Sequence, residues 1–252
     1  MIVVLRGLSY NSANAIQFGD GREKQLMEFI DSHPNILAMK GSPQAVCDTI
    51  DQFCRDHHFL MNLGPHKSRV IEELIKANKP QCFVEFGGYM GYSALRLGAT
   101  LRDVYYSSYI VSEGKKPVYY VLERDAFFAS CINKLVGLAG LEDVVKVVIG
   151  DSASSIRWLQ KETPSLVVDM VLFDHDELQY TPDLCLLERL GLVGRGSIII
   201  ADNVIIPGAP DYLEFLRQAV LDGRYVSRQV PSFLPFGIPE PLEVTTICRN
   251  SP

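Results

Sequence analysis

A glycine-rich turn between an apolar strand and a helix is the feature that most constrains this chain. Cys82–Phe86 is an apolar run that contains one carboxylate, Glu85, and three glycines follow within five residues, at Gly87, Gly88 and Gly91. Glycine lets backbone approach a ligand where a Cβ atom would clash. Because open α/β sheets bind ligands at the carboxyl ends of their strands, the turn predicts a bound ligand here.

The spacing of these glycines and the preceding acid narrow the class of ligand. The pattern is not G-x-G-x-x-G, so the dinucleotide fingerprint is not met and a dinucleotide-dependent oxidoreductase is disfavoured. A carboxylate at Glu85 suits a pyrophosphate poorly. It better suits a ligand with a cationic or hydroxyl-bearing end.

The rest of the chain alternates between short apolar runs and helical patterns. Strands are predicted at Cys82–Phe86, Val118–Leu122, Val144–Ile149, Val168–Phe173, Ser197–Ala201 and Val244–Cys248, and helices at Ser93–Leu101, Ala126–Ala139, Ser152–Lys161, Pro182–Leu190 and Pro210–Leu221. Short, nearly all-apolar strands are typical of buried parallel strands, and their alternation with helices predicts a doubly wound α/β sheet. Tyr225–Arg249 lacks a helical pattern and is expected to form two antiparallel edge strands around a proline-rich loop.

The N-terminal third adds helices and an extension. Residues 1–22 have no clear period and are interpreted as an arm, so that residues 23–252 form a single domain. A helix is predicted to start at Ser42, with Ser42 as N-cap and Pro43 at the first helical position, and another covers Lys67–Asn78. Arg102–Lys116 is interpreted as a polar, tyrosine-rich insertion.

Composition excludes several classes of protein. A net charge of −6 leaves no basic footprint for nucleic acid. No run approaches the roughly 20 apolar residues that a membrane span needs, and the N-terminal apolar stretch is too short for a signal peptide. Six scattered cysteines without a C-x-x-C pair predict free thiols and a reducing, cytoplasmic setting.

Carboxylates recur where predicted strands end. Glu123 ends the second strand, where an acid can accept hydrogen bonds from a ribose diol or can cap the following helix. Asp151, ahead of Ser152 and Ala153, is most simply an N-cap, and a ligand contact there would use the same helix N-terminus.

A third group of strand-end residues has the character of a metal site. Asp174 ends one predicted strand, and Asp202 and Asn203 end the next, so parallel pairing would bring three oxygen-bearing side chains to one rim. Two carboxylates and an amide oxygen suit Mg²⁺, which keeps waters or substrate oxygens as its remaining ligands. Without His or Cys, zinc is disfavoured. The alternative is two unrelated acids that cap helices.

Taken together, these segments resemble the catechol O-methyltransferases, small metal-dependent methyltransferases that use S-adenosylmethionine. The matching segments, in chain order, are Met61–Gly64, Glu85–Ser93, Gly137–Leu141, Asp169–His175, Tyr180–Asp183 and Ala201–Gly208. The resemblance implies a Rossmann-like class I methyltransferase fold, with a mostly parallel seven-stranded sheet, an antiparallel C-terminal edge strand and extra N-terminal helices.

The resemblance also implies roles at the matched positions. The cofactor-binding set would be Met61, Leu63, Glu85, Gly87, Tyr89 and Ser93 around the methionine part, Glu123 and Arg124 by the ribose, Ser152, Ala153 and His175 by the adenine, and Asp174. Glu85 would hold the amino group of the cofactor. Asp174, Asp202 and Asn203 would bind Mg²⁺, which would chelate vicinal oxygens of a small-molecule acceptor during in-line methyl transfer.

The chain departs from the family where the acceptor loses its proton. The family has a lysine base three residues after the first metal aspartate, and here that position is Glu177, the candidate catalytic residue. Glu has a pKa of about 4.3 and Lys about 10.4, so Glu177 is the poorer proton acceptor by up to about 8 kcal/mol. A metal could acidify the acceptor, burial beside Asp174 and Asp176 could raise the pKa of Glu177, or the acceptor could differ from a plain catechol.

Two further points bear on the acceptor. A site with Asp174, Asp176, Glu177 and Asp202 would be strongly acidic and would favour a cationic acceptor or a second cation, unless Asp176 and Glu177 point to solvent. The family's C-terminal glutamate falls near Pro235, and its aromatic gate falls on Phe59. Loss of the lysine and the glutamate leaves open a rival function, a cofactor-binding protein of this fold with weak or no catechol activity that acts on another acceptor or as a regulatory or binding subunit.

Overall fold

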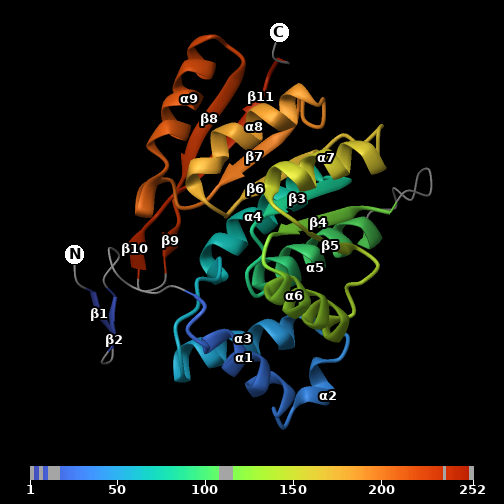
Figure 1. The fold of residues 1–252 in the computed structure, drawn as a ribbon, viewed down its shortest axis with the longest axis vertical. Helices are drawn as coiled ribbons and strands as arrows, with labels where there is room; N and C mark the ends of the chain where they lie inside the picture. The colour runs from blue at the N-terminus through green and yellow to red at the C-terminus, as the bar shows by residue number, and fades with distance from the viewer. Residues whose placement is uncertain (1–2, 6–7, 11–17, 108–115, 235–236, 250–252) are drawn as a thin grey trace.

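A computed structural model of the chain describes residues 3–5, 8–10, 18–107, 116–234 and 237–249, and a seven-stranded sheet lies at its centre (Figure 1). The strands are β3 (Cys82–Phe86), β4 (Val118–Glu123), β5 (Val145–Ile149), β6 (Met170–Phe173), β7 (Ile198–Ala201), β8 (Tyr225–Val230) and β11 (Leu242–Ile247). Their order is β5-β4-β3-β6-β7-β11-β8. β3 to β7 pair in parallel, and β11 runs antiparallel to both β7 and β8. The predicted doubly wound, mostly parallel sheet is confirmed, and its antiparallel strand lies one position in from the edge.

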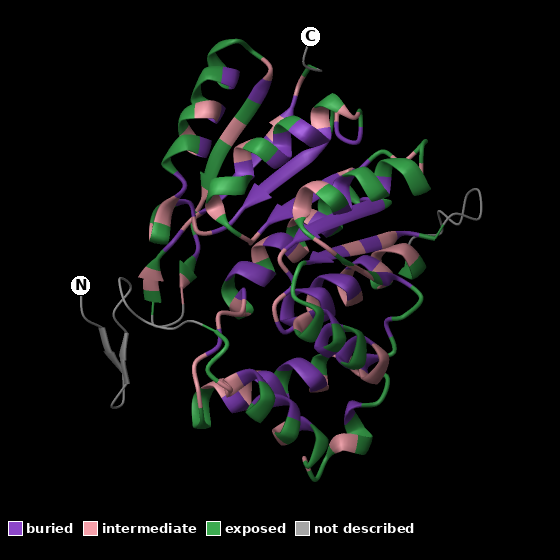
Figure 2. Ribbon diagram, in the orientation of Figure 1, coloured by how far each residue is buried: buried purple, intermediate pink, exposed green. Residues whose placement is uncertain are grey.

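Helices cover both faces of this sheet. The elements on one side are α4 (Gly64–Asn78), α5 (Tyr92–Ser107) and α6 (Ala126–Ala139), with α1 (Arg22–Asp31), α2 (Ile36–Met39) and α3 (Pro43–Asp56) packed beyond them; on the other side are α7 (Ser152–Glu162), α8 (Tyr180–Arg189) and α9 (Pro210–Leu221). Successive strand residues alternate between the faces, so Phe83 joins the first hydrophobic cluster and Val84 the second. The central strands β3, β6 and β7 are therefore buried from both sides, whereas the outer strands β5 and β8 are partly exposed (Figure 2).

Short two-stranded pairs flank the main sheet. β1 (Val3–Leu5) pairs with β2 (Leu8–Tyr10), and β9 (Phe233–Leu234) pairs with β10 (Ile238–Pro239) inside the proline-rich loop between β8 and β11. Within the described residues, no helix combines the length and apolar character needed to cross a membrane. All six cysteines are free thiols.

Predicted and observed element boundaries differ in two informative places. α5 continues to Ser107, so the first part of the predicted insertion, from Arg102, is helical. Leu97, Leu101 and Val104 form one apolar face at helical spacing. The polar and tyrosine residues between them belong to the other face, so the helical pattern is hard to recognise in the sequence. The remainder, residues 108–115, lies outside the described residues. α4 begins at Gly64, three residues before the predicted start.

The predicted cap at Ser42 is confirmed, since its Oγ accepts a hydrogen bond from the backbone N–H of Ala45 at 3.3 Å and Pro43 opens α3.

Strand register brings the ligand-bearing ends together. Phe86 of β3 pairs with Phe173 of β6, which in turn pairs with Ala201 of β7. The residues directly after these three strands, including the glycine turn, therefore lie along one edge of the sheet, where open α/β sheets bind ligands.

Candidate active site

The glycine turn is shaped by its protein neighbours. Gly87 has φ +86°, and a Cβ atom there would lie 2.4 Å from the backbone oxygen of Asp174. A Cβ atom on Gly88 would lie 2.5 Å from Val121 and 2.6 Å from Ile132. The sequence interpretation attributed these glycines to close approach of a ligand; at these two positions the protein itself already demands glycine.

Glu123 holds this turn in place. Its Oε2 accepts hydrogen bonds from the backbone N–H groups of Gly88 and Tyr89, each at 3.0 Å, and its Oε1 accepts one from Asp125 at 2.8 Å. The N-cap of α6 is Asp125, whose side chain accepts from Phe127 at 2.8 Å. Glu123 therefore stabilises the glycine turn through these hydrogen bonds. The alternative prediction that it caps the following helix, α6, is wrong, because Asp125 is the N-cap.

Glu85 is a fully buried carboxylate, and only one of its two oxygens accepts a hydrogen bond from the described residues. Its Oε2 accepts a hydrogen bond from the hydroxyl of Tyr119 at 2.9 Å, whereas Oε1 has no hydrogen-bond partner among the described residues. Burial raises the pKa of Glu85 to about 7, against the opposing effect of the Ser93 and Tyr119 hydroxyls. A buried acceptor without a partner is costly, and a ligand ammonium would satisfy it with a charge-assisted hydrogen bond.

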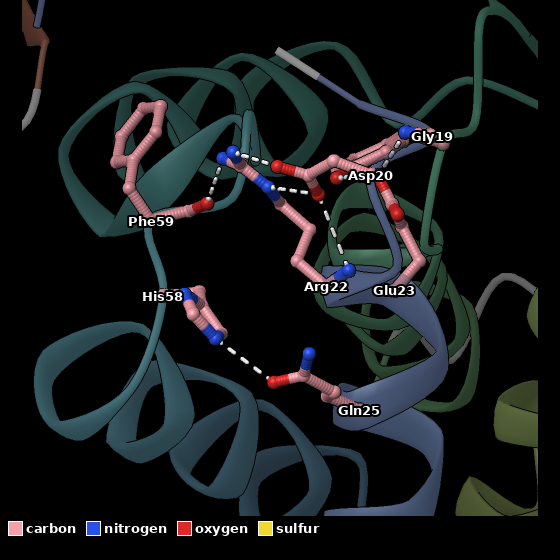
Figure 3. A network of polar contacts seen from close by, with 8 residues as sticks. Gly19, Asp20, Arg22, Glu23, Gln25, His58 and Phe59 are labelled. Carbon is pink, nitrogen blue, oxygen red and sulfur yellow. Dashed lines mark hydrogen bonds and ion pairs between the residues drawn. The ribbon is translucent and has the colours of Figure 1, made fainter. Parts of the chain in front are cut away.

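The start of α1 is tied to the glycine turn through Glu23, which the sequence interpretation missed. Glu23 is 2% exposed, and its Oε1 accepts hydrogen bonds from the hydroxyl of Tyr89 at 2.8 Å and from the backbone N–H of Gly19 at 3.0 Å. Beside it, Arg22 donates to the carbonyl oxygen of Phe59 at 2.7 Å (Figure 3). Residues 19–23 thus contact both the turn and the segment that leads to Met61.

The three predicted metal ligands follow β6 and β7. Asp202 is buried, and its Oδ1 accepts a hydrogen bond from the backbone N–H of Asn203 at 2.7 Å. The Nδ2 of Asn203 donates to the carbonyl of Ile206 at 3.0 Å, which leaves the Oδ1 of that amide for a ligand. The N-cap of the 3₁₀ turn after β6 is Asp176, so neither Asp174 nor Asp202 serves as the helix cap of the alternative reading.

Lys67 brings a buried positive charge into this acidic site. It lies on α4, is 1% exposed, and forms an ion pair with the Oδ1 of Asp202. The sequence pattern indicates that Lys67 is buried, because Lys67 lies four residues before Ile71 and eight before Ile75, on the same face of the helix. A lysine on an apolar stripe needs a partner inside the protein, and here that partner is a strand-end aspartate.

The acids around Asp174 behave differently from one another. Burial raises the pKa of Asp174 well above its usual range, the charge of Asp202 adds to this effect, and Lys67 opposes it. Glu177 is half-buried in the 3₁₀ turn Glu177–Gln179, and burial raises its pKa as well. Asp176 is exposed and accepts a hydrogen bond from the N–H of Leu178 at 3.1 Å. The solvent-facing alternative therefore describes Asp176 and not Glu177.

Glu240 is a second buried acid that the sequence interpretation missed. Its Oε1 accepts a hydrogen bond from the N–H of Ile205 at 3.0 Å, and its Oε2 is buried without a partner among the described residues. Burial raises the pKa of Glu240. Its donor Ile205 lies three residues after Asp202, which places this carboxylate near the same cluster. Pro235, the predicted counterpart of the family glutamate, lies outside the described residues.

The predicted adenine and ribose contacts lie at the neighbouring strand ends. Ser152 and Ala153 are half-buried in the first turn of α7, whose N-cap Asp151 accepts a hydrogen bond from Ser154 at 2.8 Å, so the cap reading is confirmed. His175 bonds through Nε2 to Asp183 at 2.9 Å.

Three other predicted cofactor contacts differ in exposure. Arg124 is exposed, Met61 is half-buried, and Leu63 is buried just ahead of α4. The roles of these residues remain predictions.

The oxygen set suits a hard cation. Within the described ranges, no three His, Cys, Asp or Glu side chains are arranged to hold a metal ion. The predicted set has a different composition, with carboxylates from Asp174 and Asp202 and an amide oxygen from Asn203, of the kind that Mg²⁺ supplements with waters. The amide oxygen of Asn203, which accepts no hydrogen bond from the residues that the structure describes, fits such a cation, although one Asp202 oxygen is already engaged by Lys67.

Comparisons with known proteins agree with this architecture. The chain is 33% identical over 199 residues to catechol O-methyltransferase of Mus musculus, covering 79% of this chain and 69% of that protein. It is 31% identical over 206 residues to a probable O-methyltransferase of Mycobacterium tuberculosis, covering 80% and 81%. No family model matches the sequence.

Solved structures show the same fold. An O-methyltransferase from Bacillus cereus in complex with SAH superposes with a TM-score of 0.63 at 16% identity, covering 94% of each chain. The O-methyltransferase TomG from Streptomyces achromogenes, in complex with SAM, superposes with a TM-score of 0.64 at 15% identity, covering 80% of this chain and 89% of the other.

Proposed function

Since the chain belongs to the catechol O-methyltransferase family, we propose that it transfers a methyl group from S-adenosylmethionine to a hydroxyl of a small acceptor with vicinal oxygens, with Mg²⁺ as a second cofactor. One juxtaposition carries the proposal. The oxygen of Glu85 that has no hydrogen-bond partner in the described part of the chain lies toward the same sheet edge as the oxygens of Asp174, Asp202 and Asn203. A cationic donor and a chelated acceptor would each find a suitable site there.

The cofactor would bind along the glycine turn. Glu85 would accept a hydrogen bond from the amino group of the methionine part, which supplies the partner that Oε1 lacks. Tyr89 would stand against this part of the cofactor, since Glu123 fixes its backbone and Glu23 fixes its hydroxyl. The remaining contacts would come from Met61, Leu63, Gly87, Ser93, Arg124, Ser152, Ala153 and His175.

The acceptor would bind beside the cation site. When bound by Asp174, Asp202 and Asn203, Mg²⁺ would hold vicinal oxygens and acidify the attacking hydroxyl. Glu177 would take the proton from that hydroxyl, and its raised pKa supports this role because a base is most effective when its pKa approaches the working pH. The main contribution of the enzyme would be alignment of the oxygen with the methyl group.

The test is methyl transfer from labelled S-adenosylmethionine to a panel of catechols and other vicinal diols, with Mg²⁺ and with a chelator. We expect turnover that requires the cation and fails with monohydroxy analogues. Undiminished turnover under chelation would refute the proposed Mg²⁺ dependence. Measurable S-adenosylhomocysteine binding without turnover of any acceptor would refute the proposed activity.

The second candidate is a cofactor-binding protein of this fold with little catechol activity, favoured by the replacement of the family lysine with Glu177. The variant Glu177→Lys separates the two. A large gain in catechol methylation would show a competent scaffold whose natural acceptor needs no strong base. No gain, together with intact S-adenosylhomocysteine binding, would favour the binding or regulatory role.

A further inference from the structure

Lys67 is the residue of this site that the proposed function does not use. Its ammonium group is almost completely enclosed and lies against Asp202, one of the three proposed cation ligands. A charged side chain with 1% exposure is retained at a large desolvation cost. The position therefore calls for a role in the acidic cluster.

The ion pair is not needed to hold Asp202 in position. The same Oδ1 also accepts a hydrogen bond from the N–H of Asn203 at 2.7 Å. The backbone N–H of Asp202 donates to the carbonyl of Phe173 at 2.9 Å, and its carbonyl accepts from the hydroxyl of Tyr180 at 3.1 Å. The first contact orients the carboxylate and the other two fix the backbone of Asp202, so the contribution of the lysine is chiefly its charge.

The charge has several acidic partners. Lys67 pairs with Asp202, the pairing of β6 with β7 brings Asp174 to the same edge of the sheet, and Glu240 accepts a hydrogen bond from the N–H of Ile205, three residues after Asp202. Without a cation, three carboxylates in one enclosed region would repel one another. Lys67 neutralises part of that charge before any metal binds.

We propose that Lys67 is a resident counter-cation that lowers the affinity of the Asp174, Asp202 and Asn203 site for divalent metals. It stabilises the acidic cluster in the metal-free protein, and it repels an incoming divalent cation, because like charges interact strongly where water is excluded. Metal binding would then be weak and readily reversible. This inference rests on the metal site of the proposed function and adds a residue that tunes it.

The test measures Mn²⁺ binding, used as a paramagnetic probe for Mg²⁺, by electron paramagnetic resonance of the free ion. The full chain is compared with Lys67→Met, which keeps the length of the side chain and removes its charge. We expect Lys67→Met to bind Mn²⁺ at least tenfold more tightly. Lys76→Met, on the exposed side of the same helix, is the control and should leave the affinity unchanged.

Orientation and charge predict opposite results. If Lys67 mainly positions Asp202, its loss should weaken metal binding by roughly 10- to 100-fold, as for other groups that orient metal ligands. Unchanged or weaker binding by a folded Lys67→Met protein would overturn the inference. Lys67→Gln, whose amide can still donate to Asp202, provides a second neutral variant with the same expected gain if Lys67→Met does not fold.

The same binding measurements distinguish failure of the counter-cation inference from failure of the proposed function. Tight Mn²⁺ binding by Lys67→Met with no binding by the natural protein would support the counter-cation and contradict Mg²⁺ dependence. Binding by the natural protein with no gain in either neutral variant would overturn the counter-cation and leave the proposed function standing. If no protein binds Mn²⁺, the inference is wrong, and methyl transfer in the presence of chelator then decides the proposed activity by itself.

Discussion

Glu85 offers a quantitative test of the proposed cofactor site, because its burial has a cost that substitution can remove. Its pKa is raised from 4.5 to about 7 in the folded protein. At 1.36 kcal/mol per pKa unit, ionised Glu85 destabilises the metal-free and cofactor-free fold by about 3 kcal/mol. Gln keeps the acceptor for the hydroxyl of Tyr119 but leaves a buried N–H₂ group unsatisfied, which costs about 1 kcal/mol.

The sign of the pH dependence follows from the raised pKa. Between pH 4.5 and 7 the folded protein binds more protons at Glu85 than the unfolded chain, so the free energy of unfolding falls as pH rises through this window. At pH 8 the whole penalty is present, and Glu85→Gln should be the more stable protein by about 2 kcal/mol, or roughly 4–8 °C in Tm. At pH 5 most of that advantage should be gone.

The assay is thermal or urea unfolding of both proteins at pH 5 and pH 8, followed by calorimetric titration with S-adenosylhomocysteine. The same variant should bind the cofactor product more weakly by roughly 2 kcal/mol, because a neutral amide accepts a weaker hydrogen bond from an ammonium group. A stability difference independent of pH would refute the reasoning about burial. Unchanged cofactor affinity would refute the assignment of Glu85 to the amino group.

Two further substitutions test the glycine turn and the hydrogen bond between Tyr89 and Glu23 that holds it. Gly87→Ala should lower the free energy of unfolding, measured in urea, by about 3 kcal/mol, because the added Cβ meets the backbone oxygen of Asp174 at a strained φ. The control Gly137→Ala, whose Cβ would meet only ordinary contacts, should leave the free energy of unfolding nearly unchanged. Tyr89→Phe should lower the free energy of unfolding by about 1–2 kcal/mol and speed proteolysis near residue 20, because buried Glu23 loses a hydrogen-bond donor. Equal effects in the control Tyr106→Phe, at an exposed tyrosine, would contradict this account.

Local patterns in the sequence predicted the glycine turn, the helix caps and the strand ends well, while the cofactor contacts assigned to them stay predictions. The glycine turn, the strand-end acids and the helix starts depend on residues within a few positions of one another, so spacing alone places them. Ser42 and Asp151 cap helices as expected because capping is decided within one turn. The parallel sheet follows from the alternation of strands and helices, and this alternation brings Asp174 and Asp202 to one edge.

What the sequence could not supply are contacts between distant segments. Lys67 and Asp202 are 135 residues apart, and Tyr89 and Glu23 are 66 apart, so no local pattern pairs them. Nor does a local pattern pair Glu123 with the N–H groups of Gly88 and Tyr89, which follow another strand; its predicted contact with the ribose stays a prediction. Such pairings are set by tertiary packing, which a single sequence does not display.

The same distinction bears on how the proposed acceptor site departs from its family. The residues around it come from four separate segments, with Lys67 on α4, Glu177 after β6, Asp202 after β7 and Glu240 in the loop before β11. The glycine turn and Glu85 belong to one strand–turn–helix unit, where a single change disturbs the backbone. Residues on these separate segments can change one at a time without disturbing the cofactor turn. We therefore expect the presence of Glu177, where the resemblance implies a lysine, to reflect a different acceptor and not loss of the donor site, and acceptor screening should extend beyond catechols.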